Sequence, residues 1–147
     1  MERTQVTSEI LKAKRKLNLT WGDIAEAIER SESWTATALL GQATLSTEEA
    51  EKVGSLLDLS EEIVETLTLV PYRGTTVQMP PTDPLIYRFY EILLVYGPAI
   101  KELIHEKFGD GIMSAIDYEM DIKKLEDPKG DRVIVTLNGK FLPYKKW

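Results

Sequence analysis

The sequence contains no cysteine and only one histidine, His105, among its 147 residues. The absence of cysteine excludes disulfides, thiolate metal sites, iron–sulfur clusters and cysteine nucleophiles. A single histidine is too few for a metal centre built from several imidazoles of one chain. No stretch approaches the run of about 18 apolar residues that a membrane-spanning helix needs. These absences remove the commonest metal, redox and membrane-spanning functions.

Basic residues are also in the minority. The chain has 18 Lys and Arg against 24 Asp and Glu, which gives a net charge of −6. A generally basic surface that follows phosphates is therefore excluded, and we expect no nucleic acid as a partner. The charged N-terminal stretch MERTQVTSEILKAKRK lacks the apolar core of a signal peptide, so we expect a soluble, cytoplasmic protein without a membrane partner. The apolar fraction of 43% is typical of a chain that folds.

The length suits one ordinary domain or two small ones. Residues 71–84 contain four prolines and one glycine, a density of backbone breakers that indicates a linker or an extended arm. We therefore predict two domains, with a helical bundle and linker over residues 1–79 and a second domain over residues 80–147.

Apolar residues recur at spacings of three and four from Thr7 to about Leu69, which predicts helices. Polar breaks divide this region into four predicted helices, which begin near Thr7, Thr20, Ser33 and Ser46. Thr20 followed by Asp23 is a helix N-cap signal, and Gly41 is a stop signal. The first domain is therefore predicted to be a small helical bundle.

The second domain is predicted to begin with helices. Thr82 or Asp83 caps the first of them with Pro84 at its first position, and Gly97-Pro98 is expected to kink or stop it. A second helix then follows as far as Gly109. Because the apolar residues of the first helix lie on more than one side, we expect it to be buried on several faces.

Strands follow, because the apolar period changes to two from Ile112 onwards. Ile116 to Ile122 alternate with charged residues, as in a strand with one solvent-exposed face. Residues 127–130 predict a turn, and Asn138-Gly139 predicts a tight hairpin into a third strand. The predicted fold class is α+β: a helix-turn-helix-like bundle, then two helices and a small antiparallel sheet that dimerises, because so thin a unit needs a second subunit to complete its core.

The second and third predicted helices have the spacing of a helix-turn-helix, which suggests a DNA-binding regulator with a C-terminal dimerisation domain. Residues 31–51 contain no basic residue and four glutamates, whereas a recognition helix needs lysine or arginine. This function stays the alternative. The basic stretch Lys12 to Lys16 is more often a solvated helix face than a docking site.

Two features near the predicted second helix are interpreted as structural. His105 lies about one turn from the helix end, where a protonated imidazole interacts favourably with the helix dipole. Asp110-Gly111 resembles part of a metal loop, but the oxygen-ligand spacing of calcium sites is missing. We therefore predict no metal site.

Arg88 and Glu91 are the most suggestive charged residues, since they lie three residues apart within an otherwise apolar helical segment. Charges in such surroundings usually pair or bind something. The more common explanation is a structural ion pair. The alternative is an anion site, in which Glu91 holds Arg88 and the guanidinium binds a small oxyanion, with Ser114 supplying a hydroxyl or an N–H group.

Three long stretches resemble one family. PTDPLIYRFYEILLVYG, IKELIHEKFGDGIMSAIDYEMDIKK and RVIVTLNGKFLP closely resemble the cyanase family, also called cyanate hydratase or cyanate lyase. In the bundle, ALLGQATLSTEEAEKVGSLLDL is similar to the family's N-terminal domain, so the resemblance covers nearly the whole chain.

The resemblance implies a function and a site. The catalytic arginine and glutamate of the family's YRFYE motif match Arg88 and Glu91, and its catalytic serine after GDGI matches Ser114. The family breaks down cyanate with bicarbonate, through carbamate, to ammonia and carbon dioxide, without a metal or organic cofactor. It assembles as decamers of five dimers, with active sites between subunits. The expected partners are therefore cyanate, bicarbonate and further copies of this chain, and residues 80–147 are expected to be the catalytic and dimerisation domain.

Overall fold

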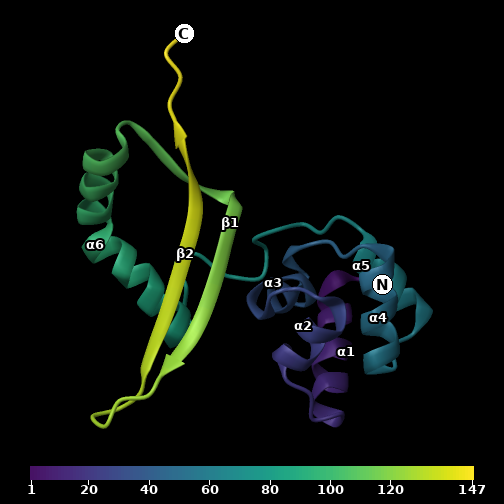
Figure 1. The fold of residues 1–147 in the computed structure, drawn as a ribbon. Helices are drawn as coiled ribbons and strands as arrows, with labels where there is room; N and C mark the ends of the chain where they lie inside the picture. Colours follow the sequence, from purple (N-terminus) through teal and green to yellow (C-terminus); the bar gives the residue numbers. More distant parts are fainter. The chain divides into compact units, whose positions relative to one another are not determined.

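The computed structural model describes residues 1–147 and confirms the α+β class (Figure 1). The elements in chain order are α1 (Arg3–Lys16), α2 (Trp21–Ile28), α3 (Glu32–Thr37), the π-helical turn η1 (Ala38–Gln42), α4 (Thr47–Leu57), α5 (Glu61–Thr68), α6 (Pro84–Phe108), β1 (Gly111–Leu125) and β2 (Arg132–Pro143). The chain divides into two compact units, one of residues 1–74 and 121–135 and one of residues 75–120 and 136–147. None of the helices is both long enough and apolar enough to cross a membrane.

Helices α1 to α5 form the bundle and share one hydrophobic core. Its buried residues are Val6, Ile10, Ile24, Ile28, Ala38, Leu39, Leu45, Ala50, Val53, Leu57, Ile63 and Leu67. The bundle has five α-helices instead of the four predicted, because Asp58 adopts a left-handed conformation and ends α4 before α5 begins. Gly41 has a φ of 95° and ends the helical path after α3, as predicted.

Side-chain caps set the helix starts in the bundle. Thr20 and Asp23 form a reciprocal capping box at α2, and Ser46 and Glu49 form another at α4, so both predicted starts are confirmed. Helix α1 begins at Arg3, four residues before the predicted start at Thr7. The early start follows from a third capping box, in which Glu2 pairs with Gln5, and the apolar period does not reveal it.

Arg3 ties α1 to three other parts of the bundle. Its guanidinium donates to the carbonyl oxygens of Thr66 at 2.7 Å, Ala43 at 2.9 Å and Ala38 at 3.2 Å. Its Nε is buried without a partner, and burial lowers the pKa of Arg3. A guanidinium stays charged even so, and the carbonyls that it binds lie near helix ends, where fewer backbone donors are available.

Helix α6 is a single helix in place of the two that were predicted. Asp83 caps it by accepting from the N–H groups of Leu85 at 3.0 Å and Ile86 at 2.9 Å, and Gly109 ends it. Pro98 lies inside the helix, which bends along its length but continues (Figure 1). Proline removes one hydrogen bond and leaves those of the flanking turns intact, so it does not oblige a helix to end.

The sheet has two strands, β1 and β2, which run antiparallel (Figure 1). The predicted turn at residues 127–130 is confirmed, since the Gly130 N–H donates to the Asp127 carbonyl at 3.0 Å. The predicted hairpin at Asn138-Gly139 is wrong, because β2 passes straight through it. Pairing with β1 along this stretch overrides the local turn preference, so the three-stranded sheet that we predicted is reduced to two long strands.

The second half of the chain has no hydrophobic core of its own. Every buried apolar side chain of the core lies between Val6 and Leu67, and α6 contains no buried residue. The expected burial of α6 on several faces therefore does not occur within one chain. The expected buried face of β1 is also absent, since Ile116 is 96% exposed and Ile122 54% exposed. The pattern of apolar residues requires a surface that the single chain does not supply.

The buried carboxylate of Glu49 connects α4 to the segment after α2. Its Oε2 accepts from the Ser46 N–H at 2.8 Å, and its Oε1 accepts from Arg30 Nε–H at 2.6 Å. Burial on its own would raise the pKa of Glu49, but these hydrogen bonds and the Arg30 charge outweigh it and lower the pKa. A lowered carboxyl pKa stabilises the fold above the ordinary pKa, and this stabilisation is lost as the pH falls through the lowered value.

We expect Glu49→Gln to lower the free energy of unfolding at pH 7 by about 1 kcal/mol, because the neutral amide weakens both the cap and the ion pair. The difference from the wild type should begin to shrink as the pH falls below about 4, the ordinary glutamate range, because the unfolded chain then binds its proton before the folded chain does, and it should be smallest below the lowered pKa of the folded state. Urea denaturation of the full chain, followed by circular dichroism at several pH values, measures both effects.

The control is Glu48→Gln, which removes the same charge one residue earlier. The Glu48 side chain is 78% exposed and pairs only with Lys52 at 2.9 Å. Equal losses of stability in the two variants would contradict the role assigned to the buried carboxylate.

Candidate active site

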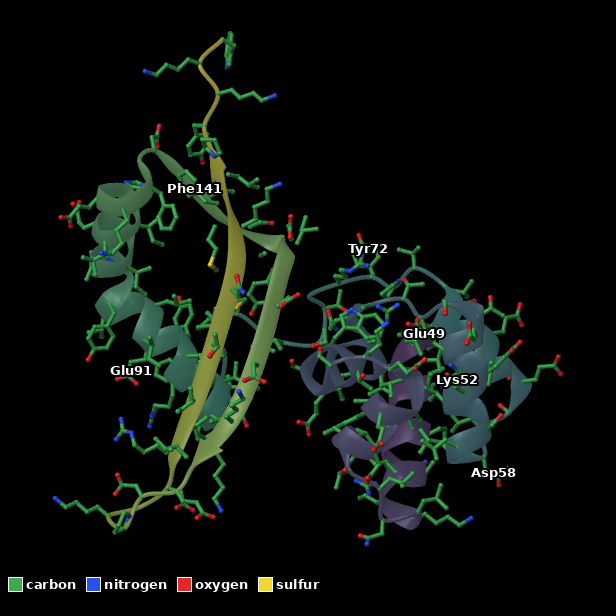
Figure 2. All side chains as sticks on the ribbon, viewed as in Figure 1. Glu49, Lys52, Asp58, Tyr72, Glu91 and Phe141 are labelled. Carbon is green, nitrogen blue, oxygen red and sulfur yellow. The ribbon has the colours of Figure 1, made fainter.

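Arg88 and Glu91 lie one turn apart in the N-terminal part of α6. Arg88 Nη1 is 3.6 Å from Glu91 Oε2, and the two side chains are 64% and 50% exposed. The Arg88 guanidinium also lies 5.8 Å from the ring centroid of Tyr87, within cation–π range. The structure therefore brings together the two residues that the sequence paired, and Figure 2 shows Glu91 projecting from α6.

This ion pair has one long contact and is open to solvent in the single chain. Exposed ion pairs contribute about 0–1 kcal/mol to stability, so a purely structural role gains little support. The apolar neighbours of Arg88 and Glu91 in the sequence predicted that the two charges would be buried, but neither side chain is buried within one chain. A guanidinium carries five N–H donors, and a single 3.6 Å contact leaves most of them free to bind an anion.

Ser114 is the fourth residue of β1 and is only 6% exposed. Its Oγ accepts from the N–H groups of Ile116 at 3.1 Å and Asp117 at 2.9 Å. A hydroxyl has two acceptor positions and one proton, so both acceptor positions are filled. Neither of these two hydrogen bonds uses the hydroxyl proton, so Ser114 can still donate a hydrogen bond.

One chain does not bring Ser114 to the Arg88–Glu91 pair. The space that a side chain at Gly139 would need is occupied by Ser114, and two residues further along β2 Phe141 stacks on Phe108, with ring centroids 5.1 Å apart. Ser114 therefore lies towards the C-terminal end of α6, the end near which Figure 2 shows Phe141. Arg88 is about 30 Å from Phe108 along this helix, at a rise of 1.5 Å per residue, and the hydrogen bonds of Ser114 are to Ile116 and Asp117.

The remaining candidates of the sequence analysis do not join either group. His105 has Lys101 as its side-chain neighbour, with Nζ and Nδ1 3.5 Å apart, and lies about five turns after Arg88. The structure contains no group of three or more acidic or histidine side chains placed to hold a metal ion.

Sequence reasoning missed the two backbone N–H groups that hold the Ser114 hydroxyl, those of Ile116 and Asp117. Every residue except proline has such a group, so residue identity carries no signal for it. A serine hydroxyl commonly accepts a hydrogen bond from a backbone N–H group two or three residues further along the chain. We did not expect this pattern in a predicted strand, because the N–H groups of a strand normally pair with the neighbouring strand.

Comparison with known proteins places both halves of the chain in one class. Residues 3–71 match the family model described as cyanate hydratase, N-terminal, and residues 78–146 match the one described as cyanate lyase C-terminal domain. A helical bundle joined to a long helix and a small sheet is therefore the two-part architecture of a cyanate lyase.

Full-length relatives support the same family. The chain is 59% identical to the cyanate hydratase of Thiobacillus denitrificans and 54% identical to that of Dechloromonas aromatica, in both cases over 100% of each chain. The crystal structure of cyanase from T. urticae is 40% identical, with a TM-score of 0.84 over 94% of this chain and 96% of that chain. The chain belongs to the cyanate hydratase family.

Proposed function

We propose that this protein is a cyanate hydratase, a lyase that uses bicarbonate to convert cyanate into ammonia and carbon dioxide. The observation that carries this proposal is the Arg88 guanidinium on α6, held by Glu91 at 3.6 Å with most of its donors unused. It belongs to a chain that matches proteins named cyanate hydratase over their entire length.

The chemistry requires a cation because both substrates are anions. Two unit charges about 4 Å apart repel by about 4 kcal/mol at an effective dielectric near 20. A guanidinium offsets this repulsion, stays charged at all relevant pH values and binds a planar oxyanion through two parallel hydrogen bonds. Arg88 is therefore assigned to holding the two anions together.

The reaction proceeds in two cleavages. A bicarbonate oxygen attacks the cyanate carbon and forms a dianionic mixed anhydride. Loss of carbon dioxide from the bicarbonate-derived part leaves carbamate, which breaks its C–N bond to give ammonia and a second carbon dioxide. Two protons are consumed in total, so that one cyanate and one bicarbonate yield one ammonia and two carbon dioxide molecules.

Each of the three site residues has a distinct role. Glu91 orients Arg88 and, as the carboxylate beside the guanidinium, can transfer protons to or from an anion bound there. The Ser114 hydroxyl donates a hydrogen bond to one substrate oxygen, in keeping with its two filled acceptor positions. No further group enters these steps, and we propose that the enzyme needs neither a metal nor an organic cofactor.

We propose that the site is completed by further copies of this chain, in a decamer of five dimers. The exposed surface of α6, and the position of Arg88 about 30 Å along the helix from the end near which Ser114 lies, support a site shared between subunits. The separate family matches over residues 3–71 and 78–146 support our division at residue 79, with catalysis and dimerisation in residues 80–147. A cytoplasmic location also stays a prediction.

The alternative function, a DNA-binding regulator, is supported only by the order of α2 and α3. Residues 31–51, which include α3, contain no lysine or arginine, so the helix that would enter the major groove offers no cation to phosphates. A gel shift that weakens with salt would favour this alternative.

The decisive experiment measures ammonia released from cyanate by the purified full chain. We expect release with bicarbonate present and none in carbonate-free buffer under argon, because bicarbonate is the attacking group. Dialysis against a chelator should leave the rate unchanged. Ammonia release that does not depend on bicarbonate would contradict the proposed reaction.

We expect Arg88→Lys to lower turnover by about 100-fold or more, since an ammonium does not reproduce the bidentate guanidinium. Circular dichroism and light scattering should show unchanged helix content and assembly. Arg15→Lys, a matched change near the end of α1, should keep the wild-type rate. Near-normal turnover in Arg88→Lys would remove Arg88 from the anion site.

Mixing two impaired variants tests whether the site is shared. Arg88→Ala subunits should be inactive alone, and Ser114→Ala subunits should keep only a small, measurable rate. When the two are unfolded and refolded together, the activity should rise above that of either variant, because some mixed sites then contain an intact Arg88 from one chain and an intact Ser114 from another. A wild-type chain that light scattering shows to be monomeric during the assay, yet fully active, would refute the shared site.

A further inference from the structure

The Asn138-Gly139 pair is the strongest turn signal in the sequence, but it lies within β2 and forms no turn. The backbone of Gly139 does not have a positive φ, unlike that of the turn glycine Gly130 at 120°. Any residue can adopt the Gly139 backbone conformation, so conformational freedom does not explain this glycine. The remaining difference between glycine and other residues is the missing side chain.

The space next to Gly139 is filled by the opposite strand at Ser114. A Cβ atom built on Gly139 would overlap the carbonyl oxygen of Ser114 and the side chain of Met113. A flexible methionine side chain can move aside, whereas a carbonyl oxygen moves only with its peptide unit. A side chain at this position would therefore displace the backbone of Ser114.

Displacement of the Ser114 backbone affects its hydroxyl directly. The Oγ is held by the N–H groups of Ile116 at 3.1 Å and Asp117 at 2.9 Å, distances that leave little room before a hydrogen bond is lost. Loss of either bond opens an acceptor position on the Oγ and frees the hydroxyl to rotate. The proton then no longer has a fixed direction.

We propose that Gly139 is a positioning residue for Ser114: its missing side chain lets β2 approach Ser114 closely, which fixes the hydroxyl as a donor. This inference rests on the role proposed above for Ser114 in binding a substrate oxygen. It adds a residue on β2 to the site, although Gly139 itself touches no substrate. It also explains why a turn sequence is present where the chain makes no turn.

Amide hydrogen exchange tests the positioning without any activity measurement. In the full chain, Gly139→Ala should speed the exchange of the Ile116 and Asp117 amides about tenfold or more, as should Ser114→Ala, which removes their acceptor. Unchanged exchange at both amides in Gly139→Ala would overturn the proposal.

A double-mutant cycle in the ammonia assay tests the functional consequence. Gly139→Ala should lower kcat/KM about tenfold or more, and the Gly139→Ala/Ser114→Ala variant should be no worse than Ser114→Ala alone, within about twofold. Losses that multiply would mean that Gly139 acts independently of Ser114 and would overturn the proposal. If the wild type released no ammonia from cyanate, the proposed function would fail, while the exchange data would still decide the positioning.

Two further variants separate positioning from general damage to the hairpin. Gly111→Ala also introduces an overlap between the strands, against Leu142 and Phe141, and should leave the Ile116 and Asp117 amides protected. Adding Met113→Ala to Gly139→Ala removes the overlap with the Met113 side chain but leaves the overlap with the Ser114 carbonyl oxygen. It should therefore restore neither the slow exchange of the two amides nor the activity. Three outcomes would refute the proposal. The first is that adding Met113→Ala restores slow amide exchange or activity to Gly139→Ala, and the second is that Gly111→Ala speeds exchange of the Ile116 and Asp117 amides as much as Gly139→Ala does. The third is that Gly139→Ala does not fold while Gly111→Ala folds.

Discussion

The structure depends on an unequal distribution of hydrophobic burial along the chain. The core lies entirely between Val6 and Leu67, whereas α6 and the β1–β2 hairpin expose most of their large apolar side chains. Large exposed apolar surfaces are rare on monomeric proteins, because covering them lowers the free energy by about 25 cal/mol per Å². In the assembly proposed above, covering these surfaces would link the folding of the second half to its contacts with further copies of the chain.

The separation of Arg88 and Ser114 follows from the same constraint. A continuous helix of 25 residues places groups at its two ends far apart, and the hairpin that follows begins at the far end. Within one chain, the Arg88 side chain on α6 is 64% exposed, whereas Ser114 on β1 is only 6% exposed. In the assembly proposed above, further copies would cover the exposed apolar surface of α6 and bring Arg88 of one chain towards Ser114 of another.

Local signals in the sequence were sufficient for much of the fold. The sequence placed helix starts at Thr20 and Ser46 and offered Thr82 or Asp83 for α6, where the structure shows Asp83; each cap binds free N–H groups of its own first turn, an interaction that depends only on neighbouring residues. Whether a helix or a strand continues past a breaker depends on the contacts of the whole element. Of the two outcomes expected at Pro98, a kink or a stop, α6 bends and continues without the predicted second helix, and the turn expected at Asn138-Gly139 does not form. Arg88 and Glu91 were found by their helical spacing, but the two N–H groups that fix Ser114 carry no sequence signal.

The core of the bundle is formed entirely by residues of the bundle, and this has a consequence for folding during synthesis. Residues 1–69 are synthesised before α6 and the two strands, and they contain every buried apolar contact of the core together with the Arg3 hydrogen bonds to Ala38, Ala43 and Thr66. Because domains fold as units during translation, this segment can reach its native structure while α6 is still being made. A folded bundle with an excess of acidic residues is then attached to the growing chain when the apolar side chains of α6 emerge.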